Sequence, residues 1–241
     1  MKKSVIFSIL FLLFLTACIT EITIPEETGT IQVFFCPKDN CEQVMIDAIS
    51  SASAVKCAFY DLDLENLTKT LKEKNADILM DEDNYEGYGK EISGYGLMHN
   101  KFCILDEKII ITGSMNPTMR GAYKNNNNLV IIESPTLVNN YLAEFDELKQ
   151  GRSDKKTKTT ELIYNNRSLQ NFFCPDDLCE EKVLTELSKA NSSIYFLTFS
   201  FTSDPIGDLL VDKRKDIQIK GIFEKSQNSK WSERKNSTCS I

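Results

Sequence analysis

The sequence predicts an α/β fold: a mixed sheet flanked by helices, built from two repeats of which the second is incomplete. Three observations predict it. Apolar runs of strand length alternate with segments whose apolar residues follow helical spacing. The pattern FFCPKDNC at 34–41 recurs as FFCPDDLC at 172–179, and the similarity continues downstream of both copies. A length of 241 residues suits one large domain or two small ones, enough to bury a core.

The first repeat is predicted at residues 29–150. Its elements are a strand at 31–35, a cysteine turn, a helix at 42–51, a strand at 55–60, a helix at 64–74 and a strand at 77–80. The polar segment 81–96, rich in glycine and tyrosine, is predicted to be a rim loop. A hairpin follows, with strands at 101–105 and 109–112, and a further strand resumes from 128.

The second repeat is predicted at residues 166–241, after a polar and basic linker at 151–165. Its elements are a strand at 170–173, a cysteine turn, a helix at 180–190, a strand at 194–199, a helix at 206–213 and a strand at 217–223. Cys174 lies 138 residues after Cys36, and this offset slips by one after the helix. Two such copies are typical of similar halves packed around a pseudo-twofold axis.

The first residues are predicted to be an export signal. Two lysines precede an apolar run at 5–15, and LTAC at 15–18 resembles a bacterial lipobox. We therefore expect a lipoprotein signal peptide at 1–17, a lipid on Cys18 and a tether at 18–28. The alternative is a plain signal peptide or a short membrane anchor. Either way we expect export, as a cell-membrane lipoprotein on the outer face or as a secreted protein.

The cysteines are interpreted in that oxidising setting, where disulfides persist. Cys36 with Cys41, and Cys174 with Cys179, are each predicted to form a local disulfide that clamps a turn before a helix. The rival is a C-x4-C metal half-site, but no histidine is nearby and the proline in each pair suits a tight turn. Two further cysteines, Cys57 and Cys103, lie in apolar runs and are expected to be buried thiols, with a bridge between them as the alternative. Cys239 is left over.

The chemistry is predicted to lie around the only histidine, His99. His99 and Lys101 are two residues apart on a strand, so their side chains point to one face. The hairpin then returns Ser114 and Asn116 to the end where it began. An imidazole, an ammonium, a hydroxyl and an amide suit a phosphoryl group: Lys101 and Asn116 hold the non-bridging oxygens and the imidazole attacks phosphorus. The alternative for a bare H-x-K is a core histidine beside a surface lysine.

The whole stretch resembles the H-x-K-x4-D-x6-G-S-x-N signature of the phospholipase D superfamily at every defined position. The matching residues are His99, Lys101, Asp106, Gly113, Ser114 and Asn116. The resemblance covers about 29–149 well and the second copy in part. It implies a phospholipase D-like fold and a phosphodiesterase that works through a phosphohistidine, without a metal or other cofactor. It makes His99 the nucleophile or its partner and Lys101, Ser114 and Asn116 the phosphate ligands. Asp106 belongs to the catalytic motif, although its turn position favours a bracing role.

One departure from the family pattern lies beyond Asn116. Many relatives carry a glutamate about ten residues further on, where it orients the histidine. This chain has KNNNN at 124–128, so Asn126 or Asn127 is the candidate to accept an imidazole N–H. A neutral amide stabilises imidazolium less than a carboxylate does. The alternative for the four asparagines is a surface turn.

The larger departure is a missing second motif. Glu224 aligns with Asp81, so the second histidine is expected near position 242 or beyond, which predicts a truncated repeat, either natural or a fragment. One hypothesis is an active homodimer that brings two copies of His99 together. Another is a catalytically inactive, membrane-tethered phosphate-binding protein. A third is a fragment too incomplete to fold well.

The substrate class stays open between a phospholipid and a nucleic acid. The compact motif resembles the small nuclease-like and cardiolipin-hydrolase-like members of the superfamily. A net charge of −7 argues against wholesale wrapping of nucleic acid without excluding a local basic cleft. The acidic start of the 81–96 segment also favours a small or lipid diester over duplex DNA.

Overall fold

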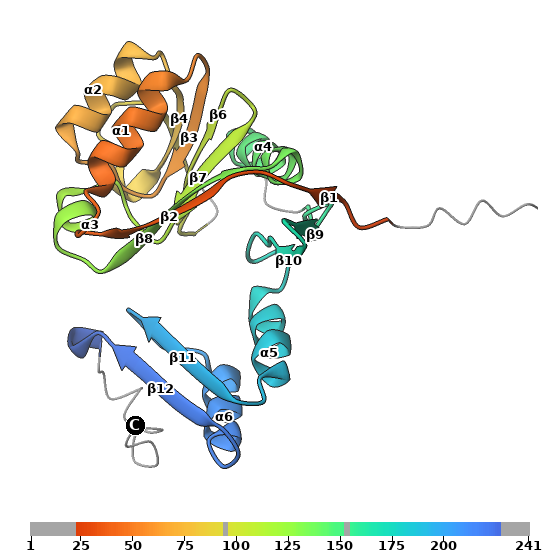
Figure 1. The fold of residues 1–241 in the computed structure, drawn as a ribbon. Helices are drawn as coiled ribbons and strands as arrows, with labels where there is room; N and C mark the ends of the chain where they lie inside the picture. Colours follow the sequence, from red (N-terminus) through yellow and green to blue (C-terminus); the bar gives the residue numbers. More distant parts are fainter. Residues whose placement is uncertain (1–22, 94–95, 152–154, 228–241) are drawn as a thin grey trace, which may run out of the picture.

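The computed structural model describes residues 23–93, 96–151 and 155–227. The predicted signal peptide, the lipidation site at Cys18 and the unpaired Cys239 lie outside these described residues. Within them, a seven-stranded mixed sheet forms the first repeat and a two-stranded parallel sheet forms the second. A small three-stranded sheet joins the two (Figure 1). The α/β prediction is confirmed.

The seven-stranded sheet has the order β2–β8–β7–β6–β3–β4–β5. Its strands are β2 (Ile31–Cys36), β3 (Val55–Phe59), β4 (Asp77–Asp81), β5 (Lys90–Ile92), β6 (Lys101–Leu105), β7 (Ile109–Gly113) and β8 (Asn127–Glu133). Strands β3, β4 and β5 are parallel and every other neighbouring pair is antiparallel. The hairpin predicted around Asp106 is therefore the β6–β7 pair at the centre of the sheet.

Helices cover both faces of this sheet (Figure 1). On one face lie α1 (Cys41–Ser51) and α2 (Glu65–Glu73), which bury Ile49 and Leu67 against Phe59. On the other lies α4 (Pro135–Gln150), whose Phe145 packs in the same cluster as Ala58. Because successive side chains of a strand alternate between faces, β3 is apolar along most of its length.

Helix α4 was not assigned from the sequence, although its ends follow ordinary capping rules. The Ser134 hydroxyl accepts a hydrogen bond from Leu137 N, and Pro135 occupies the first turn. The helix ends at Gly151, whose φ of 70° is in the left-handed region that glycine adopts without strain. A short helix, α3 (Met119–Tyr123), follows the motif and was also not predicted.

Two predicted loops contain strands. The 151–165 linker includes β9 (Glu161–Tyr164), which pairs with β1 (Glu26–Glu27) and β10 (Arg167–Gln170) and buries Leu162 against the α4 side of the sheet. The linker prediction is therefore wrong for these residues: β9 forms a hairpin with β10 across Asn165 and Asn166, and β1 joins it from far earlier in the chain. Likewise, the predicted rim loop contains a 3₁₀ turn (Glu82–Asn84) and the edge strand β5.

The second repeat follows the element order of the first. It contains α5 (Cys179–Lys189), β11 (Ser193–Thr198), α6 (Asp204–Lys213), β12 (Gln218–Phe223) and a 3₁₀ turn (Lys225–Gln227). The strand predicted at 170–173 ends instead at Gln170. Hydrogen bonds recur at equivalent positions. Lys74 Nζ donates to Ala52 O at 2.7 Å, and Lys213 Nζ donates to Ala190 O at 2.7 Å. The predicted internal repeat is thus visible in individual contacts.

The two predicted disulfides, Cys36–Cys41 and Cys174–Cys179, are present, with Cα atoms 5.7 and 5.9 Å apart. A third joins Cys57 and Cys103, which face each other across β3 and β6. The expectation of free buried thiols is therefore wrong, and the bridged alternative is what the structure shows. None of the helices in the described ranges combines the length and apolarity needed to cross a bilayer.

Candidate active site

The motif residues meet at one edge of the seven-stranded sheet. Strand β6 begins there with Lys101, which pairs with Phe59 at the end of β3. Cys103 pairs with Ile111, and continuing that register sets Lys101 opposite Gly113 at the end of β7. Asn127 begins β8 at the same edge, paired with Cys36 at the end of β2. The predicted convergence of His99 and Lys101 with the G-S-x-N segment therefore follows from the strand register.

His99 lies at the mouth of this edge, immediately before β6. Its side chain is exposed, unlike that of the core histidine considered as the alternative. The imidazole packs edge-on against the Tyr60 ring, with ring centroids 4.6 Å apart. Lys101 is half-buried, its Nζ donates to His99 O at 2.7 Å, and it lies 5.2 Å from the Tyr60 ring centroid. Tyr60 thus contacts both functional side chains.

The local electrostatics suit a nucleophile beside a phosphate ligand. Partial desolvation, and then the charge of Lys101, lower the pKa of His99, while Asp81 opposes them. Desolvation lowers the pKa of Lys101 to about 8 against the opposing charges of Asp61 and Asp81. The lowered pKa of His99 favours the uncharged imidazole at neutral pH, whereas Lys101 remains mostly an ammonium. Desolvation also raises the pKa of Asp61, with Asp63 adding to the effect.

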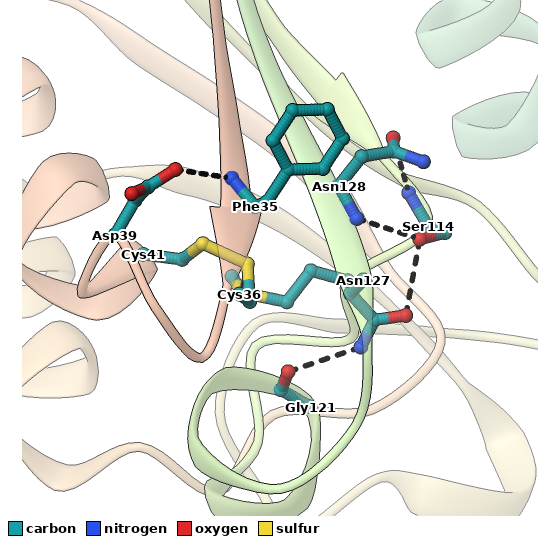
Figure 2. The surroundings of a disulfide bond; sticks show 9 residues. Phe35, Cys36, Asp39, Cys41, Ser114, Gly121, Asn127 and Asn128 are labelled. Carbon is teal, nitrogen blue, oxygen red and sulfur yellow. Dashed lines mark hydrogen bonds between the residues drawn. A yellow bond between two sulfur atoms is a disulfide. The ribbon is translucent and has the colours of Figure 1, made fainter.

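Ser114 is held by the asparagine run (Figure 2). Its hydroxyl donates to Asn127 Oδ1 at 3.0 Å and accepts from Asn128 N at 3.0 Å. Asn127 Nδ2 in turn donates to Gly121 O at 3.0 Å. Both ends of the Asn127 amide are therefore engaged, and they orient Ser114. This differs from the predicted role of Asn127 in orienting His99, and Asn126 is an exposed residue just before β8.

Asn116 is placed by the segment that follows it. Gly121 packs so tightly on this segment that an added Cβ would lie 2.0 Å from Asn116 O. Asp63, from the loop after β3, accepts from Met119 N at 2.5 Å and donates its own N–H to Pro117 O at 3.2 Å. Asn116 Oδ1 is buried and finds no hydrogen-bond partner in the part of the chain that the structure describes. The amide therefore has unused bonding capacity at the site.

Asp106 does not belong to this edge, which corrects its assignment to the catalytic group. It lies in the β6–β7 turn, at the opposite end of β6 from Lys101. Its Oδ1 accepts from Ser53 N at 2.8 Å and from Ala54 N at 2.7 Å. The motif aspartate thus fastens the hairpin to the start of β3, as its turn position suggested.

Three supporting residues were missed from the sequence. Tyr60 packs on His99, and Asp81 accepts from Met98 N at 2.8 Å through a buried carboxylate. Glu144, on α4, accepts from Asn100 Nδ2 at 3.1 Å, and burial raises its pKa to about 7. Of the three, Asp81 could have been recognised from the sequence, because it is an acidic residue at the end of an apolar strand.

Across residues 23–93, 96–151 and 155–227, the acidic, histidine and cysteine side chains form no group of three suited to a metal ion.

A protein-family comparison decides which family this architecture belongs to. The model described as "Cardiolipin synthase, PLD-like domain" matches residues 19–149, more than half of the chain. The chain belongs to the phospholipase D superfamily. That assignment agrees with the motif at the sheet edge and covers the whole first repeat.

Curated relatives match a shorter stretch. Mitochondrial cardiolipin hydrolase from Mus musculus is 42% identical over 53 residues, 22% of this chain and 24% of the relative. Phospholipase D from Rickettsia typhi is 38% identical over 58 residues, 24% of this chain and 26% of the relative. The chain thus spans about a quarter of the length of the curated relatives that it matches.

A solved structure shares the fold over most of this chain. Phosphatidylserine synthase from Haemophilus influenzae has a TM-score of 0.57 at 9% identity and covers 80% of this chain and 61% of its own. Nuc, a phospholipase D family member from Salmonella typhimurium, has a TM-score of 0.47 at 24% identity and covers 52% of this chain and 99% of its own. The first match extends well beyond half of the chain, so it includes part of the second repeat.

Proposed function

We propose that this protein hydrolyses a phosphodiester through a covalent phosphohistidine at His99. The observation that carries the proposal is the strand register, which brings His99, Lys101, Ser114 and Asn116 to one sheet edge. The lowered pKa of His99 supports it, because an uncharged imidazole is the nucleophilic form. The relatives named as a cardiolipin hydrolase and a phospholipase D support the same reaction type.

In the first step an imidazole nitrogen of His99 attacks phosphorus, and the bond to the leaving oxygen breaks as the N–P bond forms. Lys101 and Asn116 bind the non-bridging oxygens, where negative charge concentrates. The leaving oxygen takes a proton from a general acid, which must be a group other than His99. In the second step water attacks phosphorus, the N–P bond breaks, and the imidazole is released while a base takes the proton from the water.

The second acid and base is expected to be another imidazole. The chain contains one histidine, so this group comes from outside these 241 residues. We propose a second copy of the chain as the source, with two His99 side chains facing one another. We also retain the expectation that a lipid on Cys18 tethers the protein to a membrane and brings the site near lipid head groups.

For the substrate, we favour a small or lipid diester over a polyanion. Burial raises the pKa of Asp61, and the negative charges of Asp63 and Glu86 raise it further. The charge of Asp61 in turn raises the pKa of Lys101. A long nucleic acid would bring additional phosphates against these charges. A single phosphodiester with a neutral or cationic leaving group avoids that repulsion.

The second candidate function is binding of phosphate without turnover by a tethered, inactive protein. The specific observation in its favour is Asn127, which engages Ser114 and Gly121 and leaves position 127 without a charge. Lys101, Ser114 and Asn116 would still bind a phosphate monoester or diester. The two candidates differ in whether His99 forms a covalent bond.

The test compares residues 19–241 with a His99→Ala variant. Oligomeric state is measured by light scattering, and turnover of bis(p-nitrophenyl) phosphate is measured with EDTA present. The phosphodiesterase proposal predicts EDTA-resistant turnover that is lost in the variant, and a dimer in solution. A folded protein that binds inorganic phosphate but shows no turnover in either form would favour the binding function. Turnover that persists in the variant would contradict the assignment of His99.

A further inference from the structure

In the proposed reaction His99 acquires a positive charge, and the neutral residue at position 127 does not balance it. A histidine that attacks phosphorus becomes cationic as the N–P bond forms, so a nearby carboxylate stabilises the intermediate. Asn127 is neutral, and its amide is already bonded to Ser114 and Gly121. If the first repeat is catalytic, a negative charge from elsewhere must act on His99.

Asp81 is placed to supply that charge. It ends β4, beside β3 in the parallel pair, and its side chain is almost fully buried, with 1% of its surface exposed. Its Oδ2 accepts from Met98 N at 2.8 Å, the peptide N–H directly before His99 in the chain. Its Oδ1 accepts from Asp83 N at 3.2 Å, which fixes the carboxylate from its own side. The two N–H donors therefore hold the carboxylate against the backbone that leads into His99.

The other charged groups around His99 are less suited to this role. The positive charge of Lys101 lowers the pKa of His99. The charge of Asp81 has the opposite effect and raises the pKa of both His99 and Lys101. Asp61 acts on Lys101, but burial and Asp63 raise its pKa. Glu144, on α4, bonds Asn100, and burial raises its pKa to about 7, so it is only partly ionised at neutral pH.

We propose that Asp81 is a positioning residue for the reaction at His99. Its carboxylate anchors the backbone before His99 and provides the counter-charge that Asn127 does not. This inference rests on the proposed function for its catalytic meaning, but the electrostatic coupling between Asp81 and His99 can be measured without turnover. The second repeat contains the corresponding acid, since Glu224 follows the end of β12 as Asp81 ends β4.

The experiment uses the single imidazole as a probe. Because His99 is the only histidine, its ring proton resonances can be followed by NMR through a pH titration without ambiguity. The variants are Asp81→Asn, which keeps an oxygen acceptor for Met98 N and removes the charge, and Asp81→Glu, which restores the charge. Asp106→Asn is the matched control, because Asp106 also bonds two backbone N–H groups but lies at the far end of β6.

We expect Asp81→Asn to lower the pKa of His99, because the substitution removes a nearby negative charge. The imidazolium fraction at a fixed pH should then fall about twofold or more. Asp81→Glu should recover part of the shift and Asp106→Asn should leave the pKa unchanged. In active protein, Asp81→Asn should lower kcat and leave KM nearly unchanged. An unchanged or higher His99 pKa in Asp81→Asn would overturn the inference.

A second measurement, on the wild-type protein, tests the inference even if the Asp81 variants do not fold. In the wild-type protein, the carboxylate carbon resonance of Asp81 should show an inflection at the pKa of His99. A flat resonance across that pH range would overturn the inference by itself. Failure of the proposed function looks different, because turnover would then survive His99→Ala while the coupling between Asp81 and His99 remained measurable.

Discussion

The two repeats begin alike and end differently. In both, a disulfide closes a turn and the next helix begins after a residue with positive φ. A half-buried lysine, Lys74 or Lys213, then donates to the carbonyl of the residue that caps the end of that helix. In the first repeat β3 pairs with β4 and β6, and helices cover both faces of the sheet. In the second, among the residues that the structure describes, β11 pairs with β12 alone.

This difference separates local folding from site formation. The turn, helix and strand that the repeats share follow from local sequence, so they form in both. The candidate site needs β6, β7 and β8, whose ends carry the motif residues and Asn127, and the described part of the second repeat contains no such strands. Large apolar side chains are exposed on β11 and β12 and just after β11. They are Tyr195, Leu197, Phe199, Ile222 and Phe223.

The largest predicted effect is a loss of turnover, and it shows whether the catalytic residues lie in the first repeat. Lys101→Met should reduce turnover by about 100- to 1,000-fold, because it removes a charge that binds the phosphoryl oxygens. Lys213→Met, in the second repeat, should change turnover little. Steady-state kinetics of the two variants measures this contrast, and equal losses would contradict it.

The same lysine predicts the alkaline limb of the pH profile. Its pKa is lowered to about 8, so the ammonium is present below that pH and is lost as pH rises through it. Turnover should therefore fall above about pH 8. In Lys101→Arg that limb should disappear, because arginine stays protonated. A limb that remained in the arginine variant would assign it to another group.

Loss of a disulfide should destabilise the first repeat more than the second. Cys57–Cys103 closes a long loop, with 46 residues of separation, whereas Cys174–Cys179 closes one with a separation of 5. Replacing both cysteines of the long loop by alanine should cost about 4 kcal/mol in the free energy of unfolding, against about 2 kcal/mol for the short one. Urea denaturation of the two double variants gives the comparison. A larger loss from the short loop would show that loop entropy does not govern these bridges.

Core packing provides a matched leucine pair. Leu79 on β4 is fully buried against the α4 side, while Leu197 on β11 is 63% exposed. Leu79→Ala should cost about 3 kcal/mol, and Leu197→Ala under about 0.5 kcal/mol. Unfolding is followed by circular dichroism at several protein concentrations. A large, concentration-dependent loss in Leu197→Ala would mean that another chain covers β11 in solution.

The smallest effect concerns the aspartates of the two cysteine turns. Asp39 accepts from Phe35 N, whereas buried Asp177 accepts from Phe173 N and also from both the N–H and the hydroxyl of Thr157. Asp177→Ala should cost about 2 kcal/mol and Asp39→Ala about 1 kcal/mol, since more donors lose their partner in the first. Thermal unfolding of both variants measures the difference. Equal costs would mean that the extra contacts of Asp177 add no net stability.

The sequence was sufficient wherever structure depends on spacing. The strand β6 was predicted with its observed bounds, and the two-residue spacing of His99 and Lys101 placed both at the working edge. The disulfides of the cysteine turns were equally accessible, because each pair is close in the chain. Helix α4 also carries an apolar pattern of helical spacing, with Leu137, Tyr141 and Phe145 on one side.

The rest depends on contacts between distant residues. Asp81 reaches Met98 N across 17 positions of the chain, and spacing gives no sign of that bond. Strand β9 forms a local hairpin with β10, but its other neighbour, β1, comes from far earlier in the sequence. The orientation of the Asn127 amide is set by Ser114 and Gly121 together, so its role was not predictable from an asparagine run.

The most direct test of the account is to trap the covalent intermediate. Protein incubated with bis(p-nitrophenyl) phosphate is quenched in alkaline denaturant, where an N–P bond to histidine survives, and its intact mass and peptides are measured. A phosphohistidine mechanism predicts a p-nitrophenyl phosphoryl adduct on His99, absent from His99→Ala. Turnover without any adduct at His99, or an adduct at another residue, would contradict it.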